Sequence, residues 1–182
     1  MGQNGERDLI ERARALEAEA LNELYRRYAD AVFRYIFYRI NDTAAAEDLT
    51  GDVFVKAIEG LPSYQVTGKP FEAWLYSIAH ARVIDYYRRQ QVRRTTPLNE
   101  ALAAGDGTNP DTLVVQRDDV RRVQAALKQI TEEQQQVVLL RFINGHSLLE
   151  VAEILGRSEG AIKALQHRAL AALRRVLEHK DG

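Results

Sequence analysis

The chain has 182 residues, of which 46% are apolar, and a formal net charge of −1. This length and apolar content suffice for one or two domains with a buried core. The absence of cysteine excludes disulfides, thiolate metal sites and cysteine nucleophiles. No apolar run approaches the roughly 20 residues of a membrane helix, and the start, MGQNGERDLIERA, lacks a hydrophobic signal segment. We therefore expect a soluble, cytoplasmic protein without membrane insertion.

The near-zero net charge conceals three charged segments. Residues 82–94 and 157–175 each carry a net charge of +4, whereas residues 98–119 between them carry −4. Non-specific affinity for DNA grows with the number of phosphates that a protein neutralises. Two basic surfaces separated by an acidic connector predict a chain that binds DNA weakly on its own.

The N-terminal half has the periodicity of helices. Residues 9–40 predict one helix with an apolar stripe made of Leu16, Ala20, Leu24, Tyr28, Val32 and Tyr35. The sequence Asn41-Asp42-Thr43 breaks this pattern and can cap a second helix over 44–61. The predicted buried face of that helix is Leu49, Val53, Ala57, Ile58 and Leu61. Its outward face is acidic, with Glu47, Asp48, Asp52 and Glu59, and acidic residues near a helix start also suit the helix dipole.

A loop over 62–70, rich in Pro and Gly, precedes a long helix over 71–94. The predicted buried stripe of this helix is Phe71, Trp74, Leu75, Ile78, Ala81 and Ile84 or Asp85. Its end, DYYRRQQVRR, alternates tyrosine with arginine, a mixture that can stack on bases and neutralise phosphates of single-stranded nucleic acid. Phe71 and Trp74 are interpreted as core residues, and Tyr86 and Tyr87 remain open to either role.

Residues 95–111 predict a domain boundary, because Gly, Pro, Asn, Thr and Asp are frequent there and the helical period disappears. A second helical unit begins near Thr112, and its first stripe is Val115, Val120, Val123, Ala126, Leu127 and Ile130. Thr131 and Gln134 form a capping box for the next helix. The apolar positions of that helix are Val137, Val138, Leu140, Phe142 and Ile143, and the segment ends at Asn144-Gly145.

The last stretch, SLLEVAEILGRSEGAIKALQHRALAALRR, predicts a helix-turn-helix. Ser147 and Glu150 form a capping box, Gly156 ends the first helix, and Ser158 can cap the second. The first helix would bury Leu148, Val151, Ala152 and Leu155. The second would bury Ile162, Leu165, Ala169, Leu173 and Leu177. Glu159, Lys163, Gln166, His167 and Arg174 then lie on the other face, where donors and acceptors can reach base edges in a major groove.

An ordinary helical hairpin with a solvated charged face would explain this last stretch equally well if it stood alone. The excess of positive charge in residues 157–175 favours DNA binding.

The sequence gives no support for catalysis, because the four histidines have no metal-ligand spacing and no phosphate-binding loop or nucleophile motif occurs. We expect a protein that is not an enzyme and that has no cofactor.

Two separate stretches resemble the extracytoplasmic-function (ECF) sigma factors of the bacterial sigma-70 family. The first is AAEDLTGDVFVKAIEGLPSY followed by FEAWLYSIAHARVIDYYRR, which is similar to region 2. The second is the helix-turn-helix stretch, which is similar to region 4. The resemblance implies an all-α protein with a region 2-like domain over 10–94, a flexible acidic linker over 95–111 and a region 4-like domain over 112–178.

This resemblance also implies a function, a promoter-specificity factor that directs RNA polymerase core to promoter DNA and initiates transcription. Its implied partners are the β′ and β subunits of the core, promoter DNA and an anti-sigma factor. Glu47, Asp48 and Asp52 would dock on the β′ clamp helices. The −10 element would meet Tyr64, Lys69, Arg82, Asp85, Tyr86, Arg88 and Arg89. The −35 element would meet Arg157, Ser158, Glu159, Gly160, Lys163, Gln166, His167, Arg168 and Arg174. The acidic linker would thread toward the active centre of the polymerase.

The recognition helix departs from the family pattern at Leu165 and Leu170, where relatives often carry arginine. We expect Leu165 to have turned into the core. Two alternatives stay open from the sequence: a stand-alone helix-turn-helix regulator, and an adaptor that uses these helices for protein contacts only. The first leaves the acidic helix and the tyrosine-arginine helix without a role.

Overall fold

The computed structural model describes residues 3–95 and 114–178, and within these ranges every regular element is a helix or helical turn. The predicted linker, apart from Thr95, lies outside the described residues. We call residues 3–95 the N-terminal unit and residues 114–178 the C-terminal unit. In these ranges no helix combines the length and apolar character needed to cross a membrane.

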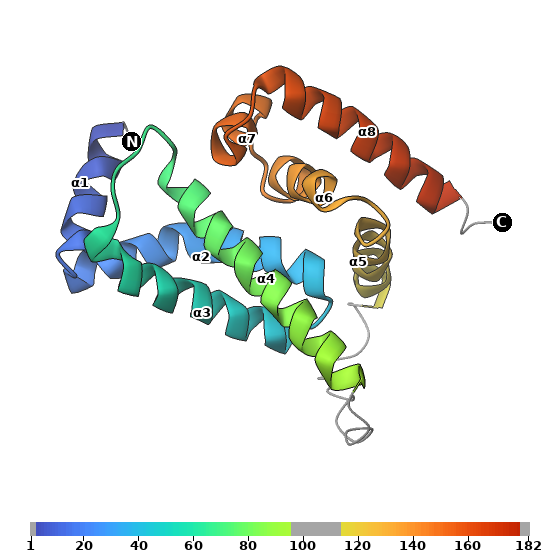
Figure 1. Cartoon of the computed structure of the whole chain (residues 1–182), viewed down its shortest axis with the longest axis horizontal. Coiled ribbons are helices and arrows are strands. Elements are labelled where there is room, and N and C mark those ends of the chain that lie inside the picture. The colour runs from blue at the N-terminus through green and yellow to red at the C-terminus, as the bar shows by residue number, and fades with distance from the viewer. Residues whose placement is uncertain (1–2, 96–113, 179–182) are drawn as a thin grey trace.

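The N-terminal unit consists of four helices and one short turn. These are α1 (Gln3–Arg14), α2 (Ala18–Ile40), α3 (Thr43–Gly60), the 3₁₀ turn η1 (Leu61–Ser63) and α4 (Phe71–Thr95). Helices α2, α3 and α4 pack against one another, and α1 folds back on α2. Figure 1 shows that the C-terminal half of α4 extends beyond the rest of this unit. Helix α4 is therefore built into the core as far as Tyr87, whereas residues 88–95 extend past it.

The single helix predicted over 9–40 is wrong, because the chain turns between α1 and α2. Leu16 adopts a left-handed conformation with φ of 59° and is 50% exposed, although the sequence predicts it on the buried stripe. The Leu16 N–H donates to the carbonyl of Ala13 (2.9 Å), and Arg12 pairs with Glu17 across the turn. The rest of the stripe, from Ala20 to Tyr35, is buried as predicted.

Helix α3 begins where the sequence predicts. The Asp42 carboxylate accepts from the Ala45 N–H (2.9 Å), and Asn41 ends α2 with φ of 55°. Glu47, Asp48, Asp52 and Glu59 are all exposed. The predicted burial of Ile58 is wrong, since this side chain is 41% exposed and Phe54 is buried instead.

The predicted stripe of α4 is partly wrong. Phe71 and Leu75 are buried, but the core continues through Ala79 and Val83, while Ala81 is exposed and Trp74 and Ile78 are half-buried. The difference arises because α4 packs on two neighbours, α2 and α3, and is crossed by α7 near its start. A helix with several neighbours buries a wider arc than a single stripe.

The C-terminal unit consists of α5 (Val114–Leu127), α6 (Glu132–Val138), the π-helical turn η2 (Leu139–Ile143), α7 (Leu148–Leu155) and α8 (Glu159–Glu178). Both predicted capping boxes form, at Thr131 with Gln134 and at Ser147 with Glu150. Gly156 ends α7 with φ of 64°, and the Ser158 hydroxyl accepts from the Ala161 N–H (3.2 Å) at the start of α8. The predicted helix-turn-helix is confirmed.

Several predicted core positions of the C-terminal unit are wrong. Val123 is 38% exposed and Gln124 is 2% exposed in its place, because the Gln124 amide donates to the main-chain oxygen of Phe37 in α2 (2.8 Å). Phe142 and Leu177 are exposed at 50% and 44%, whereas Leu165 is buried as expected. Ile154, which the sequence did not assign to the core, is buried against the N-terminal unit.

Candidate nucleic-acid interface

An aromatic pocket lies between the loop after η1 and the first turns of α4. We call it the α4 pocket; its volume is about 690 Å³ and it is lined by Gly60, Ser63, Tyr64, Gln65, Thr67, Lys69, Pro70, Ala73, Trp74, Ser77 and Ile154. The Tyr64 and Trp74 rings lie 4.6 Å apart between centroids and are tilted by 35°. The Phe71 ring packs edge-on against both, with its centroid 5.4 Å from that of Tyr64 and 5.6 Å from that of Trp74.

This pocket can accept a flat apolar group with polar edges. The half-buried rings of Tyr64 and Trp74 offer faces for stacking, which contributes roughly 1–3 kcal/mol per base in single-stranded nucleic acid. Thr67, Gln65 and Lys69 supply donors and acceptors at the rim. Burial raises the pKa of Tyr64 above its ordinary value, so its hydroxyl stays neutral.

Glycine at position 60 makes room for the pocket. A Cβ at this position would lie 2.9 Å from Cζ2 of Trp74, which is closer than real contacts allow. The sequence predicts Trp74 in the core and indicates no role for Gly60. The signal that could have found them is the coincidence of a helix-ending glycine, a Pro-rich loop and two aromatics ten residues apart.

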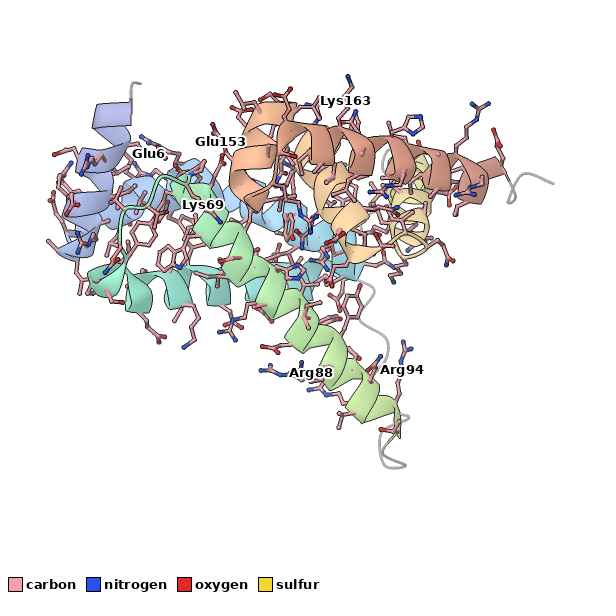
Figure 2. The ribbon with its side chains drawn as sticks, turned by 45° about the horizontal axis from the view of Figure 1, so that its top comes forward. Glu6, Lys69, Arg88, Arg94, Glu153 and Lys163 are labelled. Carbon is pink, nitrogen blue, oxygen red and sulfur yellow. The ribbon has the colours of Figure 1, made fainter. Side chains whose placement is uncertain are left out.

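The predicted −10 residues divide into two groups. Tyr64 and Lys69 line the α4 pocket. Arg82, Asp85, Tyr86, Arg88 and Arg89 lie on the second half of α4. Fourteen residues separate Trp74 from Arg88, which corresponds to about 21 Å along a helix. Figure 2 shows Lys69 at one end of α4 and Arg88 and Arg94 at the other.

Ion pairs order part of the basic group. The Asp85 carboxylate lies 4.0 Å from Arg82 and 3.5 Å from Arg88, so it can hold both guanidinium groups along one side of α4. Arg88 keeps 72% of its side chain exposed, and Arg89 is exposed as well. Tyr87 is fixed, because its hydroxyl donates to the main-chain oxygen of Arg39. Exposed cations along one side of a helix suit a phosphate backbone.

The outer face of α8 forms a second candidate surface. Lys163 and His167 lie one turn apart and are exposed, and with Gly160, Ala164 and Arg168 they line a shallow depression of about 480 Å³. Figure 2 shows Lys163 on the side of α8 that faces away from the N-terminal unit. A helix with exposed donors and a small residue at its start fits a major groove.

Four other residues of the predicted −35 set already have partners within the C-terminal unit. Arg157 pairs with Glu133, and Arg174 pairs with Glu178 (2.7 Å). Ser158 caps α8, and the half-buried Gln166 accepts from Nε of Arg141 (2.9 Å). Arg141 also donates to the main-chain oxygen of His146. Arg141, to which the sequence assigns no function, thereby ties the recognition helix to the loop before α7.

The acidic face of α3 is the third candidate surface. Glu47, Asp48 and Asp52 are exposed and lie away from the buried side of the helix, as the sequence predicts. Tyr25 and Val55 are 51% and 55% exposed, and Tyr25 packs edge-on against Phe54 of α3 (4.9 Å between centroids). Apolar groups beside carboxylates are typical of protein-binding surfaces rather than of nucleic-acid contacts.

Comparison with known proteins finds two family models that match separate stretches of the chain. The sigma-70 region 2 family model matches residues 24–93, and the sigma-70 region 4 model matches residues 126–175. The chain is 38% identical over 171 residues to the ECF RNA polymerase sigma factor BldN of Streptomyces coelicolor, covering 93% of this chain and 65% of BldN. It is 35% identical over 166 residues to the ECF RNA polymerase sigma factor SigX of Bacillus subtilis, covering 88% of this chain and 84% of SigX.

Solved structures agree with the fold. The structure of CnrH in complex with the cytosolic domain of CnrY aligns with a TM-score of 0.70 and 25% identity, covering 95% of this chain and 97% of that chain. The sigma factor RpoE in complex with the anti-sigma factor NepR from Bartonella quintana aligns with a TM-score of 0.60 at 22% identity, over 86% of this chain and 96% of that chain.

These matches define a DNA-binding transcription initiation factor. The chain belongs to the ECF RNA polymerase sigma factors of the sigma-70 family. The stand-alone regulator considered from the sequence is not favoured, because both regions match in family order. Factors of this kind initiate transcription and are not catalytic enzymes.

Proposed function

We propose that this sigma factor divides promoter recognition between the α4 pocket and the outer face of α8. The observation that carries the proposal is the pocket lined by Tyr64 and Trp74 at the head of a helix whose other end is basic. An unpaired base of the −10 element enters the pocket, and Arg82, Tyr86, Arg88 and Arg89 follow the strand. Removing a base from the duplex stack costs a few kcal/mol, which stacking and cationic contacts offset.

The outer face of α8 binds the −35 duplex in the major groove. Lys163 and His167 occupy the centre of the exposed face, so they address base edges, while Arg168 is placed for a phosphate. Arg157, Ser158, Glu159, Gly160, Gln166 and Arg174 complete the surface. Arg157 and Arg174 exchange their present carboxylate partners for phosphates, and Gln166 keeps its bond to Arg141.

The acidic face of α3 docks on the polymerase core through Glu47, Asp48 and Asp52, with the β′ clamp helices as the partner. The β subunit and an anti-sigma factor complete the set of partners. Support for the latter is that RpoE of Bartonella quintana, which has the same fold, was solved with an anti-sigma factor. The factor acts in the cytoplasm, contributes no chemistry of its own and needs no cofactor.

Run-off transcription with purified core polymerase tests this function. Adding the full chain to core should give initiation at a defined position on a promoter library, and core alone should not. The double variant Asp48→Lys/Asp52→Lys should weaken core binding by at least about tenfold, because like charges placed across an interface cost several kcal/mol.

The matched control is Glu19→Lys/Glu23→Lys, which reverses two exposed carboxylates at the same spacing on α2. Equal core affinity for the two double variants would show that the acidic face of α3 does not bind the polymerase core. Specific promoter binding by the isolated chain at physiological salt, without core, would favour a stand-alone regulator instead.

A further inference from the structure

Arg141, in the turn η2, lies against the recognition helix and is held in place by three contacts. Its Nε donates to Oε1 of Gln166 on α8 (2.9 Å), and its Nη1 donates to the main-chain oxygen of His146. Its Cζ also lies 5.6 Å from the centroid of the Phe142 ring. Three contacts to one planar group restrict its rotation, so Arg141 is a fixed donor beside α8.

The bond from Arg141 decides which way the Gln166 amide points. A guanidinium group can only donate hydrogen bonds, so the amide atom beside it is the carbonyl oxygen and the NH₂ group lies on the other side. In the reverse orientation two donors would face each other next to a positive charge, and the charge-assisted bond would be lost. The amide therefore has one favoured orientation before any ligand binds.

The Nε2 group of Gln166 stays available to a ligand. Within residues 3–95 and 114–178 it donates no hydrogen bond, and it is not one of the buried side-chain atoms of these ranges that lack a partner. Because Gln166 is half-buried, an Nε2 atom outside that set reaches solvent. Gln166 thus offers two N–H donors to solvent, while its acceptor is already bound to Arg141.

The neighbours of Gln166 along α8 add no acceptor. Side chains three and four residues away are adjacent on a helix, and here these are Ile162, Lys163, Ala169 and Leu170. Ile162 and Ala169 are buried, Lys163 is exposed and Leu170 is 43% exposed. Figure 2 shows Lys163 pointing away from the N-terminal unit. The accessible surface around the amide consists of an ammonium group and an apolar side chain.

The bases differ in what they offer such a surface in the major groove. Guanine and thymine present a carbonyl oxygen, whereas adenine and cytosine present an amino group. A glutamine with both ends free pairs with adenine, because it donates to N7 and accepts from the amino group. With Oε1 bound to Arg141 this pairing loses its acceptor, and the positive charge of Arg141 repels an amino hydrogen. The NH₂ group then favours a carbonyl oxygen.

We propose that Arg141 and Gln166 form a specificity-determining pair, which selects a base with a carbonyl oxygen, guanine or thymine, at one position of the −35 element. Gln166 touches the base, and Arg141 acts through it as a positioning residue from outside the recognition helix. The inference rests on the proposed binding of α8 in the major groove. It adds the chemical class of base that is selected and the residue of η2 that decides it.

Base preference, measured with holoenzyme assembled from the full chain and core polymerase, tests the pair. Closed complexes are formed on a promoter library with a constant −10 element and randomised −35 bases, and bound and unbound DNA are sequenced. At one position the parent protein should favour guanine or thymine over adenine or cytosine by about fivefold or more, the lower end of what a good base contact gives.

Gln166→Glu keeps an oxygen for Arg141 and replaces the two N–H donors by a second acceptor. The preference at the same position should reverse toward cytosine or adenine, because a carboxylate accepts from an amino group. Gln129→Glu is the matched control, since it makes the same change at an exposed residue between α5 and α6. It should keep every base preference of the parent protein, and equal preferences in the two variants would overturn the pair.

Arg141→Met releases the Gln166 amide, so adenine should gain about fivefold or more relative to guanine at this position. A uniform loss of affinity with unchanged base preferences would show that Arg141 supports only the fold, and would also overturn the pair. Circular dichroism checks folding. If Arg141→Met does not fold, the comparison of Gln166→Glu with Gln129→Glu decides alone.

The double variant Lys163→Ala/His167→Ala separates this inference from the proposed function. Altered −35 preferences in this double variant, with parental preferences in Gln166→Glu, would retain the α8 surface and overturn the pair. Parental preferences in both would overturn the pair together with the proposed reading of the −35 element by α8.

Discussion

The two nucleic-acid surfaces that we propose for this sigma factor have opposite shapes. The N-terminal unit offers a pocket walled by Tyr64 and Trp74, whereas the C-terminal unit offers a projecting helix with Lys163 and His167 on its outer face. A concave aromatic site suits a base that has left the duplex, because only an unstacked base exposes both faces. A projecting helix suits an intact major groove, in which base edges point outward.

The two surfaces also differ in how firmly their side chains are held. Tyr64, Phe71 and Trp74 contact one another with centroid distances of 4.6 to 5.6 Å, so the pocket is formed before any ligand enters. The cations of α8 are exposed, and Arg157 and Arg174 at its two ends sit in surface ion pairs, which contribute little to stability and exchange readily. The proposed roles therefore make strand opening depend on packing and duplex binding depend on charge.

The largest effect is expected from Trp74→Ala. Loss of one wall of the pocket should slow strand opening by roughly 10–100-fold, corresponding to about 1–3 kcal/mol of stacking. Formation of the closed complex should change little, because the α8 surface is intact. The measurement is the rate of permanganate reactivity at the −10 element in holoenzyme complexes.

Trp74→Phe is the control, because it keeps an aromatic face and should retain most of the opening rate. A pre-melted bubble template should rescue Trp74→Ala. A defect of the same size on bubble and duplex templates would break the division of labour between the units.

Glu72 of α4 lies beside residues of the C-terminal unit, and its substitution is expected to give the next largest effect. Its carboxyl group is buried near Glu150 of α7 and Glu6 of α1, which raises its pKa to about 7, and it lies 3.6 Å from His146. Because the pKa is raised by folding, the stability linked to this group is complete below its ordinary value of 4.5 and is lost as the pH rises through 7.

Glu72→Gln keeps the neutral form at every pH. We expect it to stabilise the protein by about 1–2 kcal/mol near pH 8, after allowing for partial solvent screening, and to have little effect near pH 4.5. Urea unfolding at the two pH values measures this difference. An equal gain in the free energy of unfolding at both pH values would show that burial of the Glu72 carboxylate does not destabilise the protein.

A smaller effect is expected from Lys163→Ala. Removal of one contact with a base edge should weaken closed-complex formation by about 1 kcal/mol, or less if Lys163 meets only a phosphate. Arg121→Ala on α5 removes the same charge from an exposed site of the same unit and should be nearly silent. On a template with a scrambled −35 element the difference between the two variants should vanish. If the difference persists, Lys163 does not contact a base of this element.

The sequence predicts well what is decided by neighbouring residues. The caps at Asp42, Thr131 and Ser147 and the stop at Gly156 form as expected, because each uses hydrogen bonds or backbone freedom within a few residues. The turn at Leu16 is missed because it contains neither glycine nor proline. Its left-handed backbone is stabilised by packing of α1 on α2 and by the Arg12–Glu17 pair.

The parts of the site that join distant segments could not be predicted. Gln124 and Asn144 look like polar surface residues in the sequence, yet each bonds to a main-chain oxygen more than eighty residues away. Ile154 is not expected in the core, and it is buried where it lines the α4 pocket together with Lys69 and Trp74 of the other unit. Helical periodicity shows which face of a helix is apolar. It does not show which other element will cover that face.

The smallest effects are expected from a pair of glycines in α3 that separates packing from helix stability. A methyl group added at Gly51 would meet no atom within 4 Å, so Gly51→Ala should stabilise the N-terminal unit by about 0.5–1 kcal/mol and leave transcription unchanged. Gly60→Ala changes the last residue of the same helix, and its Cβ would lie 2.9 Å from Cζ2 of Trp74, so the indole has to shift at the wall of the α4 pocket. Strand opening should then slow by roughly two- to fivefold, the equivalent of about 0.5–1 kcal/mol, while closed-complex formation and core binding stay unchanged.

Both variants are compared in thermal unfolding and in opening kinetics with holoenzyme. If Gly60→Ala opens DNA as fast as Gly51→Ala, the pocket tolerates a displaced Trp74 and is not the preformed site that distinguishes the N-terminal unit from the C-terminal one.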